Sequence, residues 1–280
     1  MKNTKEAASI NKKIRAAASV LLSYISLIFV QSAVSGIFAF FGAGSGMSDS
    51  IVNFLSYLSG IISSSLVYKY SAAPVNEQQN EVIHTEAESE TKAVKNVSLA
   101  KYTFYTSGAL TLMLLTNVCF ACLRESSNFM TSVHNSLIFS ALVGILIKSP
   151  LEEALFRKAY LKNLTGTLGS LPSVLTVSVL FGAWHPSGSR IFAFISSIIL
   201  GALYLGIREI SNDERSDRAF ICTSICHASF NALMYIAEAV YIHLDLSVFG
   251  TVCTEALLSA LIFASSAASL TIKKRRQAMR

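Results

Sequence analysis

Three short segments of this chain place polar and ionisable side chains inside otherwise apolar stretches. They are Glu152-Glu153-Ala-Leu-Phe-Arg157, Phe181-Gly-Ala-Trp-His185 and His227-Ala-Ser-Phe-Asn231. A charged side chain near the centre of a lipid bilayer costs about 2.5–3.5 kcal/mol on insertion scales. Two carboxylates, a guanidinium and two imidazoles in such surroundings predict a polar functional site inside a membrane protein.

The two glutamates of the first segment are expected to differ in their surroundings. On a helix, Glu153 and Arg157 are four residues apart and share a face, so we expect them to pair as a supporting ion pair. Glu152 lies about 100° further around the helix, beside apolar residues. We therefore take Glu152 as the candidate general base. The alternative is that all three side chains lie in water at the cytoplasmic end of a helix.

The other two segments each place a histidine four residues from a second group. Phe181 and His185 share one helix face, and His227 and Asn231 share another. Taken alone, a histidine at a helix end such as His185 is usually a cap or an exposed residue. His227 and Asn231 could bind a metal, orient a water, donate to an oxyanion or bridge to a neighbouring helix.

Together, one glutamate, two histidines and an amide on three helices could converge on a water molecule. Glu152 could deprotonate the water, and the histidines could orient it or the scissile carbonyl. Asn231 could donate a hydrogen bond to the oxyanion, an interaction worth about 2.7–4 kcal/mol in hydrolases. This set of groups predicts peptide-bond hydrolysis in a membrane pocket.

The composition also indicates a membrane protein. Hydrophobic residues make up 52% of the chain and charged residues 14%, whereas soluble domains carry about 25% charged residues. We predict an all-α, polytopic membrane bundle of about eight transmembrane helices. The eight apolar stretches are Ala16–Gly42, Ile51–Tyr70, Tyr102–Leu123, Val133–Ile147, Leu171–Trp184, Ile191–Ile207, Ala219–Tyr241 and Leu246–Ile272.

Two of these stretches are short for a membrane span of about 20 residues. We expect Val133–Ile147 to continue as helix through Pro150 and the glutamates, with a kink where the proline removes a hydrogen bond. Leu171–Trp184 is expected to be a kinked or partial span.

Charge divides the chain into four parts. Residues 1–70 form a basic head and two membrane helices, 71–101 a polar, flexible or partly helical cytoplasmic loop, 102–272 the core that carries the motifs, and 273–280 a basic tail. Because both ends are basic, both termini are expected in the cytoplasm. The net charge of +6 is explained by this topology and by anionic lipid. No basic face suited to nucleic acid is present.

The ordered motifs resemble the signature of the CPBP family, the CAAX proteases and bacteriocin-processing proteins also called the Abi family. E-E-x-x-x-R, F-x-x-x-H and H-x-x-x-N/D are all intact between Val133 and Tyr241. The resemblance implies an intramembrane endopeptidase in which Glu152 and His185 activate the water. It further implies that His227 and Asn231 form the oxyanion site. The first half of the chain carries no family motif.

The resemblance leaves the metal open. Glu152, His185 and His227 could ligate zinc, but we favour a metal-free, glutamate-dependent enzyme without a cofactor. We expect a peptide or membrane-protein substrate and a bacterial plasma membrane. The sequence does not indicate the oligomeric state.

Two other functions are alternatives to the protease. One is a membrane scaffold or bacteriocin self-immunity protein that binds a partner such as a sensor kinase or exporter. The other is a transporter, for which the sequence lacks repeat symmetry.

Overall fold

The structure, a computed structural model, describes residues 2–40, 47–86, 99–123, 142–212 and 217–244, with short helical pieces between 254 and 271. Helices make up all the elements of these ranges, which contain no strand. Among the described residues, five helices are long and apolar enough to cross a membrane. They are Ser9–Phe40, Ile51–Ala72, Leu99–Phe120, Ser187–Ser211 and Asp217–Ile236. The predicted class, a polytopic helical membrane bundle, is confirmed.

Of the three remaining predicted stretches, one is described in full and two only in part. The helix α7 (Ser170–Trp184) is apolar but shorter than these five, as expected for a partial span. Val133–Ile147 is described only from residue 142, and most of Leu246–Ile272 and all of the 273–280 tail lie outside the described residues. Eight spans and cytoplasmic termini therefore stay predictions.

The chain divides into two compact units. The first joins Met1–Ala93 to Ala154–Leu180, and the second joins Val94–Glu153 to Phe181–Arg280.

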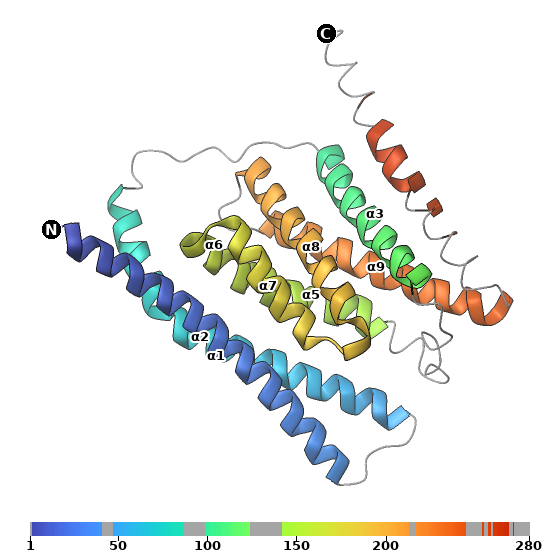
Figure 1. The fold of residues 1–280 in the computed structure, drawn as a ribbon, viewed down its shortest axis with the longest axis horizontal. Helices are drawn as coiled ribbons and strands as arrows, with labels where there is room; N and C mark the ends of the chain where they lie inside the picture. Colours follow the sequence, from blue (N-terminus) through green and yellow to red (C-terminus); the bar gives the residue numbers. More distant parts are fainter. Residues whose placement is uncertain are drawn as a thin grey trace. The chain divides into compact units, whose positions relative to one another are not determined.

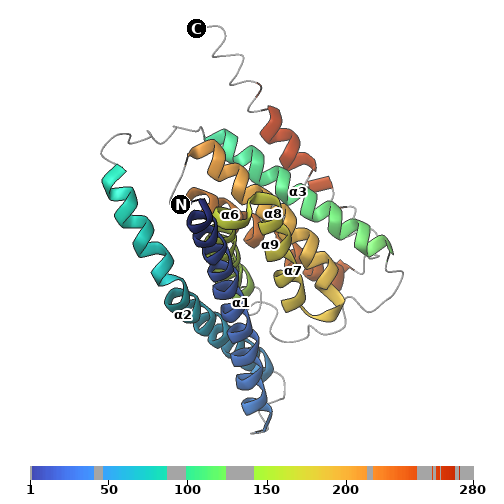
Figure 2. The ribbon, with the colours of Figure 1, turned by 60° about the vertical axis from the view of Figure 1, so that its left-hand side comes forward.

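The first unit is built on two long helices, α1 (Lys2–Phe40) and α2 (Met47–Glu86), which pack against each other (Figures 1 and 2). A Cβ added at Gly60 would lie 2.8 Å from the carbonyl oxygen of Leu27. This helix pair therefore depends on a small residue for its close approach. Because α2 continues to Glu86, the first part of the predicted 71–101 loop is helical, and residues 87–98 lie outside the described part.

A buried cluster of three hydroxyl groups joins these helices to η2 (Ala154–Leu161), a π-helix of the same unit. The oxygens of Ser23, Ser64 and Tyr160 lie 2.7–2.8 Å from one another. The hydroxyl of Tyr68 also donates to the carbonyl of Ala159 at 3.0 Å. Polar side chains commonly bridge helices in membranes, and here they hold η2 against the N-terminal helices. The short helix α6 (Lys162–Leu168) and most of α7 complete the unit.

The second unit packs α3 (Leu99–Leu123), α8 (Arg190–Ser211) and α9 (Asp217–Leu244) around aromatic contacts. The ring of Phe192 stacks on Phe230 with centroids 5.3 Å apart and meets the edge of Phe120 at 6.3 Å. The amide of Asn117 donates to the sulfur of Met234 at 3.2 Å. These contacts fix α9, the helix that carries His227 and Asn231.

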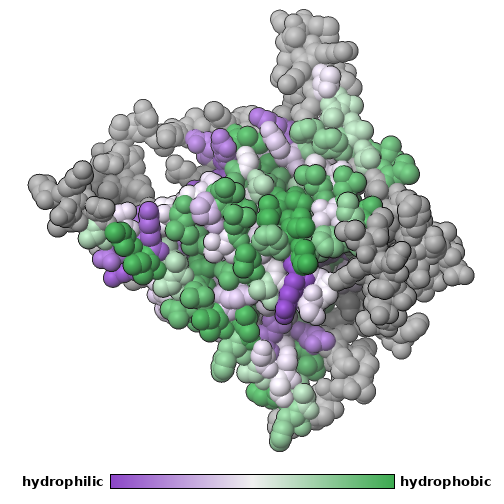
Figure 3. Space-filling view, viewed as in Figure 1, coloured by the Kyte–Doolittle hydropathy of each residue, from purple (hydrophilic) through white to green (hydrophobic). Residues whose placement is uncertain are grey.

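The surface and the interior have the polarity expected of a protein in lipid. Hydrophobic side chains cover much of the described surface in Figure 3, with hydrophilic ones gathered in a few places. Phe29 is 70% exposed and Ile191 is 65% exposed, whereas Ser149 and Glu153 are fully buried. Large exposed apolar patches mark surfaces that meet a membrane or a partner. Ser149, Glu152, Glu153 and His227 are buried, whereas His185 and Asn231 are half-buried.

The helix that carries the glutamates changes its geometry on both sides of them. A single α-helical turn, α5 (Ser149–Glu153), lies between the π-helices η1 (Gly144–Lys148) and η2. The backbone N–H of Ser149 bonds to the carbonyl of Gly144, five residues back. The prediction that helix continues through Pro150 is confirmed, and the distortion takes the form of a π-helical turn. Such turns are frequent at functional sites.

Candidate active site

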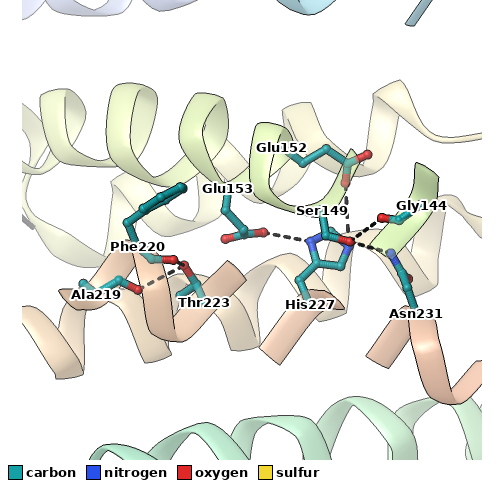
Figure 4. A network of polar contacts seen from close by, with 9 residues as sticks. All are labelled: Gly144, Ser149, Glu152, Glu153, Ala219, Phe220, Thr223, His227 and Asn231. Atoms are coloured by element: carbon teal, nitrogen blue, oxygen red, sulfur yellow. Dashed lines mark hydrogen bonds and ion pairs between the residues drawn. The ribbon is translucent and has the colours of Figure 1, made fainter. Parts of the chain in front are cut away.

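His227 lies between the two glutamates of α5 (Figure 4). Its Nδ1 is 3.0 Å from Oε1 of Glu153, and its Nε2 is 3.6 Å from Oε2 of Glu152. The side chains of His227 and Glu152 are only 9% and 10% exposed, and that of Glu153 is fully buried. An ionised carboxylate only accepts hydrogen bonds, so Nδ1 carries a hydrogen. Glu153 thereby fixes the orientation of the ring and directs Nε2 at Glu152.

Asn231 follows one helical turn later and meets the same segment of chain. Its Nδ2 donates to Oγ of Ser149 at 2.8 Å, and this hydroxyl donates to the carbonyl of Gly144 at 2.8 Å. Figure 4 shows Asn231 and His227 projecting from α9 toward the segment that carries Ser149 and the glutamates. One face of α9 therefore supplies both the imidazole and the amide.

His185 lies just beyond the last residue of α7, before the single 3-10 turn η3 (Ser187–Ser189). Its Nδ1 is 2.8 Å from the carbonyl oxygen of Phe181. Because a carbonyl only accepts, Nδ1 donates and Nε2 carries the lone pair of the neutral ring. The ring of Phe181 is buried, and its centroid lies 4.4 Å from that of His185 and 6.1 Å from that of His227. Phe181 thus places both histidines against one aromatic side chain.

The structure therefore brings the predicted residues together to different degrees. Glu152, Glu153 and His227 are in direct polar contact, and His185 joins them through the ring of Phe181. The partner shown for Glu153 is His227, a contact that the helical spacing did not predict. The predicted pairing of Glu153 with Arg157 stays a prediction.

The alternative that this segment lies in water is not supported. Arg157 and Glu153 are fully buried, and Glu152 is 8% exposed.

Ser149 is the polar residue of this site that sequence reasoning missed. It is fully buried and links Asn231 to the backbone of η1. A signal was available, because Ser149 precedes Glu152 by three residues and Glu153 by four. On a helix this spacing places it on the face of the glutamates.

A metal site requires several His, Cys, Asp or Glu side chains to lie close together. No three His, Cys, Asp or Glu side chains within the described ranges lie close enough together to hold a metal ion. The zinc set of Glu152, His185 and His227 does not form such a group in this geometry.

The fold and the site define a polytopic helical membrane protein with a buried carboxylate–imidazole centre. Residues 134–233 match the family described as type II CAAX prenyl endopeptidase, Rce1-like. All three motifs lie within this segment, so the family resemblance predicted from them is confirmed. Over this segment the chain is similar to a family of CAAX-type intramembrane proteases. No curated protein and no solved structure matches the chain.

Proposed function

We propose that this protein is an endopeptidase that hydrolyses peptide bonds of a membrane-associated or secreted substrate with a water activated by Glu152. The observation that carries the proposal is the position of the Glu152 carboxylate, nearly buried and 3.6 Å from Nε2 of His227. The other nitrogen of this imidazole is bonded to Glu153. A positioned carboxylate in a site sheltered from water can act as a general base.

The first step of the proposed reaction forms the new carbon–oxygen bond. Glu152 takes a proton from the water as the water oxygen attacks the scissile carbonyl carbon. The Nε2 lone pair of His185 accepts a hydrogen bond from the same water and orients it. In the second step the carbon–nitrogen bond breaks, and the proton held by Glu152 passes to the leaving amine. Glu152 is then a carboxylate again, ready for the next turnover.

His227 and Asn231 stabilise the negative charge that develops on the carbonyl oxygen. Asn231 offers an amide N–H, and His227 offers Nε2–H when both ring nitrogens are protonated. Glu153 accepts from Nδ1 at 3.0 Å and so holds the ring with Nε2 directed into the site. The 3.6 Å between Nε2 and Glu152 is longer than a hydrogen bond, so a substrate oxygen can compete for this donor. Removal of one such donor lowers kcat by about 10²- to 10³-fold in hydrolases.

The proposed mechanism uses no metal or cofactor. We propose a bacterial plasma membrane as the location of the protein. The substrate class follows from the family, whose description names CAAX prenyl endopeptidases. We extend it here to a peptide or protein held at the membrane.

The test compares the peptides released by cells that carry the wild-type protein with those released by cells that carry the Glu152→Gln variant. Glutamine keeps the size and shape of the side chain but cannot act as the base. We expect a defined set of peptides to disappear. Glu209→Gln is the matched control, because it makes the same change at an exposed position of α8. Unchanged peptides together with full biological function in E152Q would instead favour a scaffold.

A further inference from the structure

We propose that Ser149 is a positioning residue that sets the direction of the Asn231 amide and thereby aims one of its N–H groups at the oxyanion. The inference rests on the proposed function. It adds a residue that lies outside the E-E-x-x-x-R, F-x-x-x-H and H-x-x-x-N motifs.

The direction of the amide follows from counting donors and acceptors. The carbonyl of Gly144 can only accept a hydrogen bond, and a serine hydroxyl has a single hydrogen. Since Oγ of Ser149 lies 2.8 Å from this carbonyl, the hydroxyl hydrogen points there. Toward Asn231, also 2.8 Å away, Ser149 is left as an acceptor. The end of the amide that faces Ser149 must therefore be the NH2 group.

This direction matters for the developing negative charge. The NH2 group carries two hydrogens, of which one is used on Ser149. The second N–H diverges from the first and is the one that we assign to the oxyanion. Without Ser149 the amide could turn over and present its carbonyl oxygen, which repels a negative charge. Ser149 thus fixes which end of the Asn231 amide, the NH2 group, is available as a donor.

The carbonyl of Gly144, which accepts the hydrogen bond from Ser149, is itself held in place. The carbonyl of Gly144 also accepts the backbone N–H of Ser149 in the π-helical turn. A Cβ added at Gly144 would lie 3.1 Å from the hydroxyl oxygen of Tyr235. Tyr235 is one helical turn after Asn231 on α9, so η1 and α9 are in close contact beside the amide. Donors fixed before the reaction stabilise a transition state without reorganisation.

A purely structural hydrogen bond would behave differently from a positioning one. A structural bond stabilises the protein whatever residue stands at 231. A positioning bond acts on the reaction only through Asn231. A double-mutant cycle separates the two because coupled residues give non-additive effects.

The experiment uses the full-length protein in liposomes and a peptide substrate taken from the peptides that E152Q fails to release. We expect Ser149→Ala to lower kcat by about 10- to 100-fold, as loss of a supporting partner does, with KM nearly unchanged. The double variant S149A/N231A should be no slower than Asn231→Ala alone. Ser149→Thr keeps the hydroxyl and should recover most of the rate.

Ser211→Ala is the matched control. Ser211 is a fully buried serine of α8 whose hydroxyl donates to Ile207 of its own helix at 2.6 Å. Its loss should leave kcat unchanged. If S149A does not fold, Ser149→Cys offers a weaker acceptor of similar size for the same cycle.

Multiplicative losses in the double variant, or a raised KM with wild-type kcat, would overturn the inference. A fully active S149A beside an inactive E152Q would also overturn it and would leave the proposed function standing. Wild-type cleavage by E152Q would remove the proposed function itself.

Discussion

Glu153 holds His227 through a hydrogen bond of 3.0 Å between Oε1 and Nδ1. The first glutamate, Glu152, faces the other ring nitrogen at 3.6 Å and is slightly exposed. The two adjacent carboxylates therefore meet opposite nitrogens of one imidazole. This arrangement separates a buried carboxylate that orients the ring from a carboxylate that can reach a water.

The substitution Glu153→Gln tests this division of roles. The glutamine amide can present either its oxygen or its NH2 group to Nδ1, so the tautomer of His227 is no longer fixed and the ring loses its negative neighbour. We expect the protein to fold and the cleavage rate to fall by about 10- to 100-fold, as is typical when such a supporting carboxylate is lost. Cleavage assays beside the exposed-site variant E209Q measure the effect. A wild-type rate in E153Q would show that Glu153 does not orient His227.

Gly182 is required where the end of α7 meets the start of α8. A Cβ at this position would lie 2.9 Å from the carbonyl oxygen of Arg190 and 3.0 Å from Cβ of Phe194. Neither atom is the far end of a flexible side chain, so the two helices must move apart. We expect Gly182→Ala to lower the free energy of unfolding by about 1–3 kcal/mol. Activity should fall too, because Arg190 bonds to the backbone of His185 at 3.2 Å.

The matched control for this variant is Gly206→Ala, a glycine of α8. A Cβ at Gly206 would have no atom within 4 Å. Alanine should therefore stabilise this helix by about 0.5–1 kcal/mol. Thermal unfolding in detergent would measure both variants. Equal shifts in the same direction would contradict the packing explanation.

The long helices could be predicted from the sequence because hydropathy is a local property. The predicted stretch Tyr102–Leu123 corresponds to α3 (Leu99–Leu123). The predicted stretch Ile191–Ile207 corresponds to α8 (Arg190–Ser211). The helical extension of α2 to Glu86 was not predicted as such, since its sequence is polar and gives no apolar signal. The π-helices were missed because their hydrogen-bond pattern has no side-chain signature beyond the proline that follows η1.

The sequence singled out the residues that the structure brings together, but it gave no sign of the contact between Glu153 and His227. Ionisable groups are rare in membrane helices, so Glu152 and His227 stood out by composition alone. The spacing rule for one helix predicts Arg157 as a partner of Glu153, which stays a prediction, but it cannot predict the contact of Glu153 with His227, 74 residues away. Only tertiary packing creates such a pair. Ser149 did not stand out despite its spacing from the glutamates, because serines in helices ordinarily bond to their own backbone.

Metal removal provides a test that is independent of any substitution. In the proposed mechanism a carboxylate supplies the base and side-chain N–H groups supply the oxyanion donors. We therefore expect a strong chelator to leave the cleavage rate of the purified protein unchanged. Inactivation by the chelator that added Zn²⁺ reverses would contradict the metal-free mechanism.

The hydroxyl of Tyr160 provides a test of how α1 and α2 hold η2 in place. It lies 2.7 Å from the hydroxyls of both Ser23 and Ser64, and all three residues are buried. Tyr160 belongs to η2, which follows Glu153 directly in the chain. Tyr160→Phe removes this oxygen alone, while the two serines stay 2.8 Å apart and bonded to each other. The free energy of unfolding should therefore fall by about 0.5–1.5 kcal/mol, the usual size for one hydrogen bond.

The matched control is Tyr105→Phe, which removes the same oxygen from a tyrosine of α3 that is 39% exposed. We expect its unfolding curve to overlap with that of the wild-type protein. The cleavage rate of Y160F should also fall slightly, because a looser η2 leaves the glutamates that precede it in the chain less firmly placed. If Y160F and Y105F unfold alike, the three hydroxyls do not hold η2. The contact of η2 with α1 and α2 would then need another explanation.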